Sequence, residues 1–335
     1  MRRNRAVTPQ RFLPIAWLAL ATQVGIVVTG AAVRLTQSGL GCTDWPGCTE
    51  DRLVPAWGFH RWVEFGNRLV TFAVVAAALL AALASRRRRP YRPGLQWLSW
   101  GLVVGVFAQA LVGGVLVLLE LDPRLTVLHF VLSVVLVADG VALVHGAGED
   151  RVSAPGTPAL PAAALQAPTP DPAWRLMRTL AWVLSAAVVV VMGTGTVVTG
   201  SGPHGGDARA DRFGFALTAV TRVHTGALWI FVGCLLVTAV VVLRRGELTG
   251  HLRGRVVTLI ALVGAQATLG YVQYALGVPA ALVALHVAGS MAVFGVTVSF
   301  LLAVVAPTGR SLTPAEPGQD GRRAMSPDRP VLSAR

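Results

Sequence analysis

Two stretches of the chain carry polar side chains at matched spacings. Residues 108–129 and 265–286 align without a gap and are identical at nine of 22 positions. Each copy contains a glutamine, a glycine and a histidine at the same positions: Gln109, Gly113 and His129 in the first, and Gln266, Gly270 and His286 in the second. The same offset of 157 residues places Asn67 against His224. An internal repeat of this kind predicts two similar structural units, each with its own polar site.

The second copy is equipped to bind a metal-containing cofactor. His224 and His286 are expected at equal depth on two helices, and two imidazoles at one level can ligate the iron of a haem between them. Zinc would require a third protein ligand at that depth, and a proton relay would require a chain of acids. A single intramembrane histidine usually forms an interhelical hydrogen bond, but the pair favours a haem.

The first copy differs at one ligand position. Asn67 stands where the second copy has His224, and asparagine is a poor ligand for iron. A haem in this half would have one firm ligand, His129, and a weak or open sixth position. Glu64 lies one helical turn from Asn67 and could act as an acid or base, or stabilise a developing cation. An ion pair between Glu64 and an arginine at the membrane interface is the alternative interpretation.

Three arginines are expected at the level of these polar sites. Guanidinium groups suit the bidentate binding of carboxylates such as haem propionates. We therefore expect Arg34 and Arg68 to contact a haem in the first half and Arg222 to contact one in the second.

Two cysteines distinguish the first half further. Thr29-Gly30 aligns with Thr199-Gly200 at an offset of 170, so the first half has 13 extra residues between its first and second helices, and Cys42 and Cys48 lie in that interval. Two cysteines in an oxidising compartment favour a disulfide, structural or redox-active. Two independent thiols are the alternative, and a zinc site is less favoured because the pair lacks further ligands.

The elements that must position these residues are membrane helices. Of the 335 residues, 54% are hydrophobic and 13% are charged, whereas soluble domains carry about 25% charged residues. Apolar runs long enough to span a bilayer occur at 14–34, 62–84, 95–118, 125–145, 177–199, 216–243, 255–276 and 280–305. The first run lacks a small-residue cleavage site after it, so we interpret it as a retained helix and not a signal peptide.

The distribution of arginine predicts the orientation in the membrane. The net charge is +13, and all 29 basic residues are arginine. Of these, 21 fall in five segments, at 2–11, 86–92, 151–178, 244–255 and 310–335. By the positive-inside rule, both termini are cytoplasmic in a multi-pass protein of the cell (plasma) membrane. This asymmetry explains the positive charge without nucleic acid.

The predicted fold is an all-α integral membrane protein with eight transmembrane helices in two pseudo-symmetric four-helix bundles. Four helices separate the two copies, so both cross the membrane in the same sense as a parallel repeat. The expected parts are a cytoplasmic N-terminus (1–13), an N-terminal half with one haem site (14–145), a cytoplasmic linker (146–176), a C-terminal half with the other haem site (177–305) and a disordered cytoplasmic tail (306–335).

The motifs VTGAAVRLTQSGLGCTDWPGC and VEFGNR, together with the histidines expected on the fourth, sixth and eighth helices, resemble the haem A synthase family over about residues 14–305. The resemblance implies oxidation of the C8 methyl of haem O to a formyl group, giving haem A for terminal oxidases. It also implies low-spin haem b on His224 and His286, and substrate haem on His129 with Glu64 in the catalytic position. Many family members have histidine where this chain has Asn67.

The resemblance carries further expectations. Cys42 and Cys48 match the external cysteine pair of the family. The methyl group would be hydroxylated in successive steps, through a geminal diol that loses water. Expected partners are haem O, haem O synthase and the assembly of terminal oxidases, and a homo-oligomer is compatible with the sequence.

Two other functional classes are weighed against this one. A di-haem b-type electron-transfer cytochrome without substrate turnover predicts equivalent ligation in both halves, which the Asn67/His224 difference disfavours. A transporter built from parallel repeats predicts broken helices at mid-membrane, whereas the polar sites here are expected near one surface.

Overall fold

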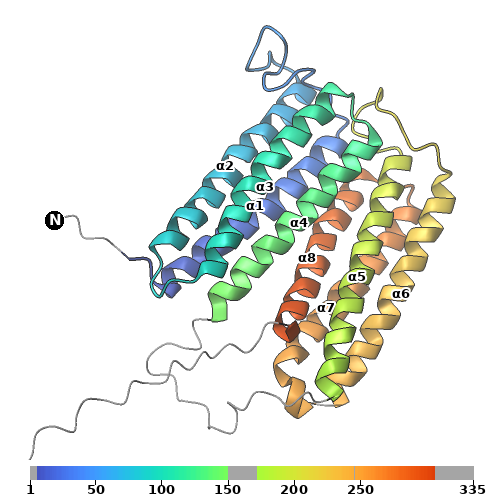
Figure 1. Cartoon of the computed structure of the whole chain (residues 1–335). Coiled ribbons are helices and arrows are strands. Elements are labelled where there is room, and N and C mark those ends of the chain that lie inside the picture. The colour runs from blue at the N-terminus through green and yellow to red at the C-terminus, as the bar shows by residue number, and fades with distance from the viewer. Residues whose placement is uncertain (1–5, 150–171, 245, 306–335) are drawn as a thin grey trace, which may run out of the picture.

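The computed structural model describes residues 6–149, 172–244 and 246–305. Within these ranges the chain forms eight α-helices (Figure 1). They are α1 (Pro9–Leu35), α2 (Phe59–Arg87), α3 (Pro93–Leu118), α4 (Pro123–Glu149), α5 (Pro172–Ser201), α6 (Leu217–Arg244), α7 (Gly246–Ala275) and α8 (Ala280–Val305). Each is long and apolar enough to cross a membrane, which confirms the predicted fold class.

The helices extend beyond the predicted apolar runs. The largest difference is in α7, which begins at Gly246 and not at 255, because helical hydrogen bonding continues through polar residues that hydropathy does not detect. Helices α4 and α5 likewise reach into the predicted linker 146–176. The remainder of that linker, the first five residues of the N-terminus and the predicted tail 306–335 lie outside the described residues.

Several helices begin on a proline, namely α1, α3, α4 and α5. Proline suits the first helical position because its missing N–H would be unpaired there and its φ is already helical. These prolines therefore fix where the helices start. In α4 the start at Pro123 sets the depth of His129, which follows six residues later.

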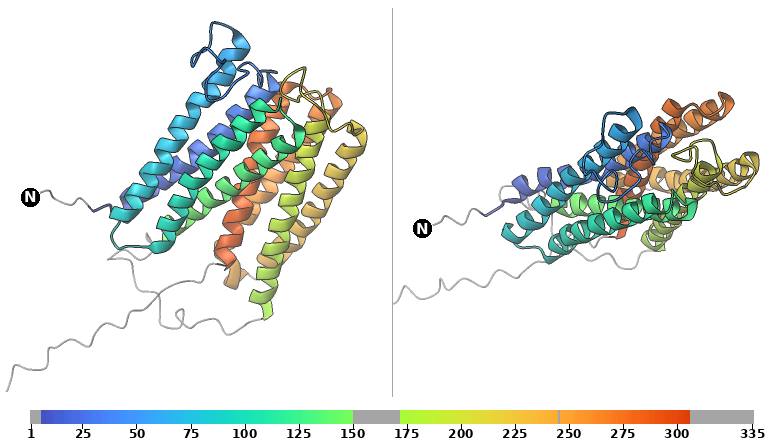
Figure 2. Two further views of the ribbon diagram at one scale, coloured as in Figure 1. Left: turned by 45° about the horizontal axis from the view of Figure 1, so that its top comes forward. Right: turned by 90° about the horizontal axis from the view of Figure 1, so that it is seen from above.

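Each half closes by the same set of helix contacts. In the N-terminal half, α1 contacts α2, α2 contacts α3, α3 contacts α4, and α4 returns to α1. In the C-terminal half, α5 to α8 contact one another in the same cyclic order. The two groups lie side by side and meet where α1 and α4 contact α8 and where α4 contacts α5 (Figures 1 and 2).

Each half has its own apolar core. The N-terminal core includes Phe12, Leu102 and Leu143, and the C-terminal core is centred on residues such as Phe231 and Phe300. Large apolar side chains also cover the outer surface of the helices, as expected for a molecule surrounded by lipid. The C-terminal core also includes Leu20 of α1 and Val137 and Val141 of α4, so it packs the two halves against each other as well.

Four connections lie at one end of the bundle, which we call the loop end (Figure 1). They comprise residues 36–58, 119–122, 202–216 and 276–279. The longest belongs to the N-terminal half and contains both cysteines. The Gly39 N–H donates to the Gly206 carbonyl at 2.8 Å and joins a loop of one half to a loop of the other. Within the C-terminal half, the His204 ring bonds the Val278 carbonyl at 2.8 Å and joins its two loops.

Candidate functional site

The two histidines of the C-terminal half face each other. His224 on α6 and His286 on α8 have ring centroids 6.5 Å apart and ring planes at 76°. Both side chains are partly buried. In the described part of the chain, α6 and α8 are opposite members of the ring of four helices and do not pack directly on each other. The imidazoles therefore meet across the interior of this half.

Their separation suits a shared metal atom. Metal–imidazole bonds are about 2.0 Å long, so one atom bound by a nitrogen of each ring sets the centroids roughly 6 Å apart. Nδ1 of His224 is held by the Val191 carbonyl at 3.0 Å and the Thr194 hydroxyl at 3.2 Å. Such bonds fix the ring of a metal-binding histidine and leave Nε2 for the metal.

His286 supplies a second observation that fits ligation. Its Nδ1 is buried and has no hydrogen-bond partner among the described residues. A buried polar atom without a partner is costly unless a ligand satisfies the ring. Groups of three or more His, Cys, Asp or Glu side chains that could hold a metal ion do not occur in the described ranges. Two protein ligands fit haem iron, because the macrocycle supplies the other four nitrogens.

Three glycines make room for the imidazoles. A Cβ at Gly195 would lie 3.2 Å from Cε1 of His224, and one at Gly270 would lie 3.4 Å from Cε1 of His286. In the N-terminal half, a Cβ at Gly113 would lie 3.3 Å from Cε1 of His129. Each ring thus packs directly against the backbone of a neighbouring helix, which only glycine allows without a shift.

His129 in the N-terminal half shares two features with His286. It lies against Gly113 of α3, and its Nδ1 is also buried without a hydrogen-bond partner in the described part of the chain. Gln109 of α3 donates to the His129 carbonyl at 3.1 Å and to the Ser133 hydroxyl at 2.5 Å. These bonds join α3 to α4 beside His129 and fix the position of this residue along the axis of α3.

Asn67 is held by a neighbour on α1. The Thr29 hydroxyl donates to the amide oxygen of Asn67 at 2.7 Å. Both side chains are partly buried. No sequence pattern predicts this bond, although Thr29 belongs to the segment that aligns with Thr199.

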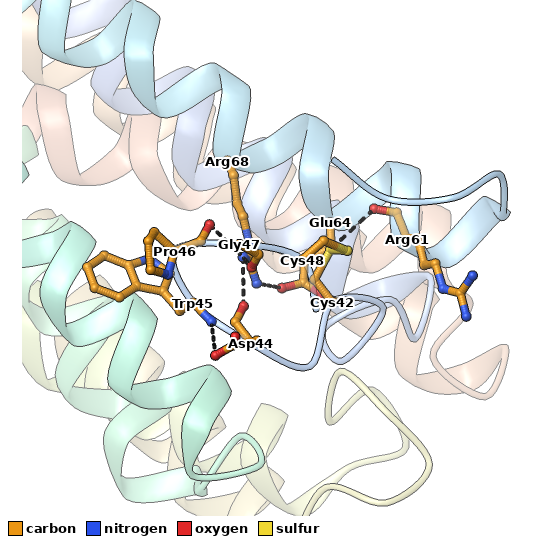
Figure 3. Close-up of a disulfide and its surroundings, with 9 residues drawn as sticks. All are labelled: Cys42, Asp44, Trp45, Pro46, Gly47, Cys48, Arg61, Glu64 and Arg68. Carbon is orange, nitrogen blue, oxygen red and sulfur yellow. Dashed lines mark hydrogen bonds and ion pairs between the residues drawn. A yellow bond between two sulfur atoms is a disulfide. The ribbon is translucent and has the colours of Figure 1, made fainter. Parts of the chain in front are cut away.

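Glu64 joins the start of α2 to the cysteine loop (Figure 3). Its Oε1 forms an ion pair with Arg68 at 2.6 Å, and its Oε2 accepts the backbone N–H of Cys42 at 2.6 Å. Only 5% of Glu64 is exposed. The structure therefore contains the ion pair that was one of the two interpretations of this residue.

The predicted disulfide is present. Cys42 and Cys48 are joined, and both are fully buried. Arg68 donates to the carbonyl oxygens of Asp44 at 2.9 Å and Gly47 at 2.6 Å, inside the loop that the disulfide closes (Figure 3). The loop is thus fixed both covalently and through the side chains of α2.

Trp45 at the tip of this loop reaches α3. A Cβ at Gly114 would lie 2.6 Å from its ring, so the indole lies directly on the α3 backbone. Gly114 follows Gly113, the residue against which His129 packs. The loop therefore lies over the N-terminal half next to its histidine, and no sequence pattern predicts this contact between Trp45 and α3.

The three predicted propionate-binding arginines lie at the loop end but in different settings. Arg68 bonds Glu64 and loop carbonyls, as described above. Arg34 donates to the carbonyl oxygens of His204 at 2.7 Å and Thr199 at 3.4 Å, and so connects α1 to the other half. Arg222 is exposed on α6. The first two guanidinium groups are largely occupied by the protein itself.

An apolar cavity of about 200 Å³ adjoins the C-terminal site. It is lined by Thr194, Val197, Phe215, Val220 and Val223. Thr194 is the residue whose hydroxyl bonds the ring of His224. Space for an apolar group therefore lies next to one of the paired imidazoles.

Comparison with known families gives a match over more than half of the chain. The family described as "Cytochrome oxidase assembly protein" (COX15-CtaA) matches residues 14–58 and 57–203. The matched part contains the cysteine loop, Glu64, Asn67 and His129. His224 and His286 lie beyond it.

Curated relatives are similar over a shorter stretch. "Heme A synthase" of Geobacillus kaustophilus (strain HTA426) is 34% identical over 108 residues, which is 31% of this chain and 32% of that protein. The proteins of the same name from Geobacillus thermodenitrificans and Bacillus cereus (strain AH187) are 32% and 31% identical over 105 residues, each 31% of this chain and 32% and 33% of those proteins. The match thus spans about a third of the length of these relatives.

Proposed function

The chain belongs to the COX15-CtaA family of cytochrome oxidase assembly proteins, and we propose that it is a haem A synthase. In this function it oxidises the C8 methyl of haem O to a formyl group, giving haem A for terminal oxidases. The observation that carries the proposal is the pair of imidazoles, His224 and His286, facing each other 6.5 Å apart in one half. The other half has the equivalent histidine, His129, on α4, and Asn67 at the position that corresponds to His224.

The C-terminal half holds a haem b in this proposal. His224 and His286 are its ligands, and the bonds of His224 to Val191 and Thr194 orient one ring before the cofactor binds. A haem held by two histidines supplies one-electron transfer. Arg222 at the loop end is the candidate contact for a propionate.

The N-terminal half receives haem O as substrate. His129 ligates it, with Gly113 leaving room for the ring. Arg34 and Arg68 stay candidates for propionate contacts, which they would have to make in addition to, or in exchange for, their present bonds to carbonyl oxygens. Trp45 and the disulfide loop cover this half and limit the access of water. The proposed steps are successive hydroxylations of the methyl group to a geminal diol, which loses water. Written with water as the source of the oxygen, the methyl group and one water become the formyl group, four protons and four electrons, and the electrons leave one at a time through the haem b of the other half to an external one-electron acceptor.

Glu64 is the proposed catalytic carboxylate. It lies one turn from Asn67 on α2, and Cys42 and Arg68 fix both of its oxygens. A carboxylate held in this way can stabilise positive charge that develops on the substrate without having to reorient. Its ion pair with Arg68 therefore agrees with a catalytic role as well as a structural one.

The proposed location is the cell (plasma) membrane, with both termini in the cytoplasm and the loop end outside. The arginine distribution supports this orientation, and the buried disulfide at the loop end agrees with an oxidising compartment. Residues 14–145 and 177–305 form the substrate and haem b halves. Haem O synthase, as the source of the substrate, and terminal-oxidase assembly are the proposed partners, and a homo-oligomer is compatible with this arrangement.

A di-haem electron-transfer cytochrome is the competing function. It requires two firm ligands in each half, and Asn67 does not supply one. The family match likewise favours the synthase.

The test is to express the full chain in a host that makes haem O but no haem A, and to identify the extracted haems by mass. The expected result is haem A in the presence of the chain and its absence from cells with an empty vector. If haem O accumulates unchanged while the protein is present in the membrane with haem b bound, the proposed activity is wrong.

A further inference from the structure

The two halves share a short segment on their first helices. Residues 25–30 read GIVVTG and residues 195–200 read GTVVTG, identical at five of six positions. Gly25 thus corresponds to Gly195, and Thr29 corresponds to Thr199. Because Gly195 faces the ring of His224, Gly25 marks where an imidazole would lie in the N-terminal half.

That place is empty in the N-terminal half. A Cβ at Gly25 would meet no atom within 4 Å, whereas one at Gly195 would lie 3.2 Å from His224. Gly25 is one turn before Thr29, so both residues share the face of α1 that is turned toward Asn67. The shorter asparagine side chain does not reach the glycine, and the space remains open.

The supporting residues have changed with the ligand. In the C-terminal half, the Thr194 hydroxyl bonds the ring of His224, and the corresponding residue in the N-terminal half is Val24, which has no hydroxyl. Thr199 donates to the Gly195 carbonyl, whereas its counterpart Thr29 donates to Asn67. The neighbours of Asn67 therefore differ from those of His224 in a way that suits an asparagine side chain.

The bond from Thr29 also sets the direction of the Asn67 amide. It engages the amide oxygen, so the amide nitrogen is turned away from Thr29. The N–H groups of that nitrogen have no hydrogen-bond partner among the described residues. They form a donor that can serve an acceptor in the space beside Gly25.

We propose that a haem bound by His129 keeps its second axial position open, and that this position takes small ligands of haem iron next to the Asn67 amide. The ligand class is carbon monoxide for the reduced haem and cyanide for the oxidised haem. The Asn67 N–H donates to the outer atom of the bound ligand. This inference rests on the proposed haem site of the N-terminal half.

The test uses the purified holoprotein with haem in both halves. Carbon monoxide added to the reduced protein should shift the spectrum of one of the two haems and leave the low-spin haem of His224 and His286 unchanged. Asn67→His should abolish the shift and raise the low-spin fraction, because the imidazole fills the space at Gly25. His129→Ala should remove the reactive haem altogether.

The donor is tested by cyanide affinity. Asn67→Leu removes the N–H, and Thr29→Val releases the amide, so each should raise the Kd for cyanide about 3- to 10-fold, the range of one hydrogen bond. Thr199→Val, the matched change in the other half, should leave the Kd unchanged. If Asn67→Leu and Thr29→Val bind cyanide as the wild type does, Asn67 is not the donor.

The outcomes separate this inference from the proposed function. Suppose that the wild-type protein makes haem A but has two low-spin haems that do not react with carbon monoxide. This result would contradict the open position and would support the synthase activity. A protein that binds carbon monoxide at one haem but makes no haem A supports the open position and contradicts the synthase activity.

Discussion

The backbone N–H of Cys42 donates to the buried carboxylate of Glu64 at 2.6 Å, across 22 residues of sequence. This bond ties the disulfide loop to the first turns of α2. The other oxygen of Glu64 pairs with Arg68, which holds two carbonyl oxygens of the same loop. One carboxylate therefore joins the disulfide loop to α2, and its proposed catalytic role and its structural role depend on the same two oxygen atoms.

Substitution of Glu64 should separate these two roles. Glu64→Gln keeps an acceptor for the Cys42 N–H but removes the charge, so we expect a folded loop and a loss of haem A formation. Glu64→Ala leaves the Arg68 charge and the Cys42 N–H without their partner. That loss should destabilise the protein by roughly 3 kcal/mol.

The measurements are thermal unfolding, proteolysis of the loop 43–58 and haem analysis. A Glu64→Gln protein with full haem A production would remove the catalytic role. A Glu64→Ala protein that resists protease and unfolds at the wild-type temperature would remove the structural one.

The disulfide should stabilise the loop end. Cys42 and Cys48 close a loop of only a few residues, and the entropic contribution for such a loop is roughly 2 kcal/mol. The double variant Cys42→Ser/Cys48→Ser should therefore unfold at a lower temperature. Cys234→Ser, which changes an unpaired cysteine on α6, is the control and should have little effect. Non-reducing peptide mapping should recover the 42–48 link from the wild type, and finding only free thiols there would contradict the structure.

Loss of His286 should abolish the low-spin haem. In His286→Ala, the site keeps His224 as its single histidine, and the low-spin absorption and electron paramagnetic resonance signals should disappear from the purified protein. His60→Ala is a suitable control, because His60 bonds Ser38 at the loop end and is exposed. An unchanged spectrum in His286→Ala would rule out the assignment of the C-terminal site.

Alanine should be tolerated less well at Gly195, which faces His224, than at Gly25, the corresponding position of the N-terminal half. Gly195→Ala places a methyl group 3.2 Å from Cε1 of His224, whose ring is already fixed by two hydrogen bonds. Overpacking of this kind costs about 1–3 kcal/mol, so the haem content of the C-terminal site should fall. Gly25→Ala, at the corresponding position, meets open space and should retain the low-spin haem. Equal haem content in the two variants would show that close packing at Gly195 does not matter.

The sequence was sufficient for the helices and for the residues that repeat. Apolar length predicts membrane helices because the bilayer requires it, and all eight runs lie within helices of the structure apart from a residue or so at their ends. The common depth of His224 and His286 was likewise predictable, because they lie seven and six residues into helices that both start at the loop end. The disulfide followed from the position of Cys42 and Cys48 in a single loop.

The sequence was insufficient for contacts between elements that are distant along the chain. Thr29 and Asn67 are 38 residues apart, and neither residue type alone indicates that the other is its partner. Arg34 was expected to bind a propionate but donates to carbonyl oxygens of the second half, because the packing of the halves at the loop end brings those carbonyls close. Periodicity and composition carry no information about such pairings.

The most direct measurement compares the wild type with His129→Ala in a host that supplies haem O and makes no haem A of its own. Both proteins are purified, the low-spin haem is quantified by spectroscopy, and the extracted haems are identified by mass. If the two haem sites are unequal, the wild type should yield haem A. The His129→Ala variant should yield only haem O and haem b, and it should keep the low-spin haem signal of the wild type. Haem A from both proteins, or from neither while haem b is bound, would contradict a substrate site at His129.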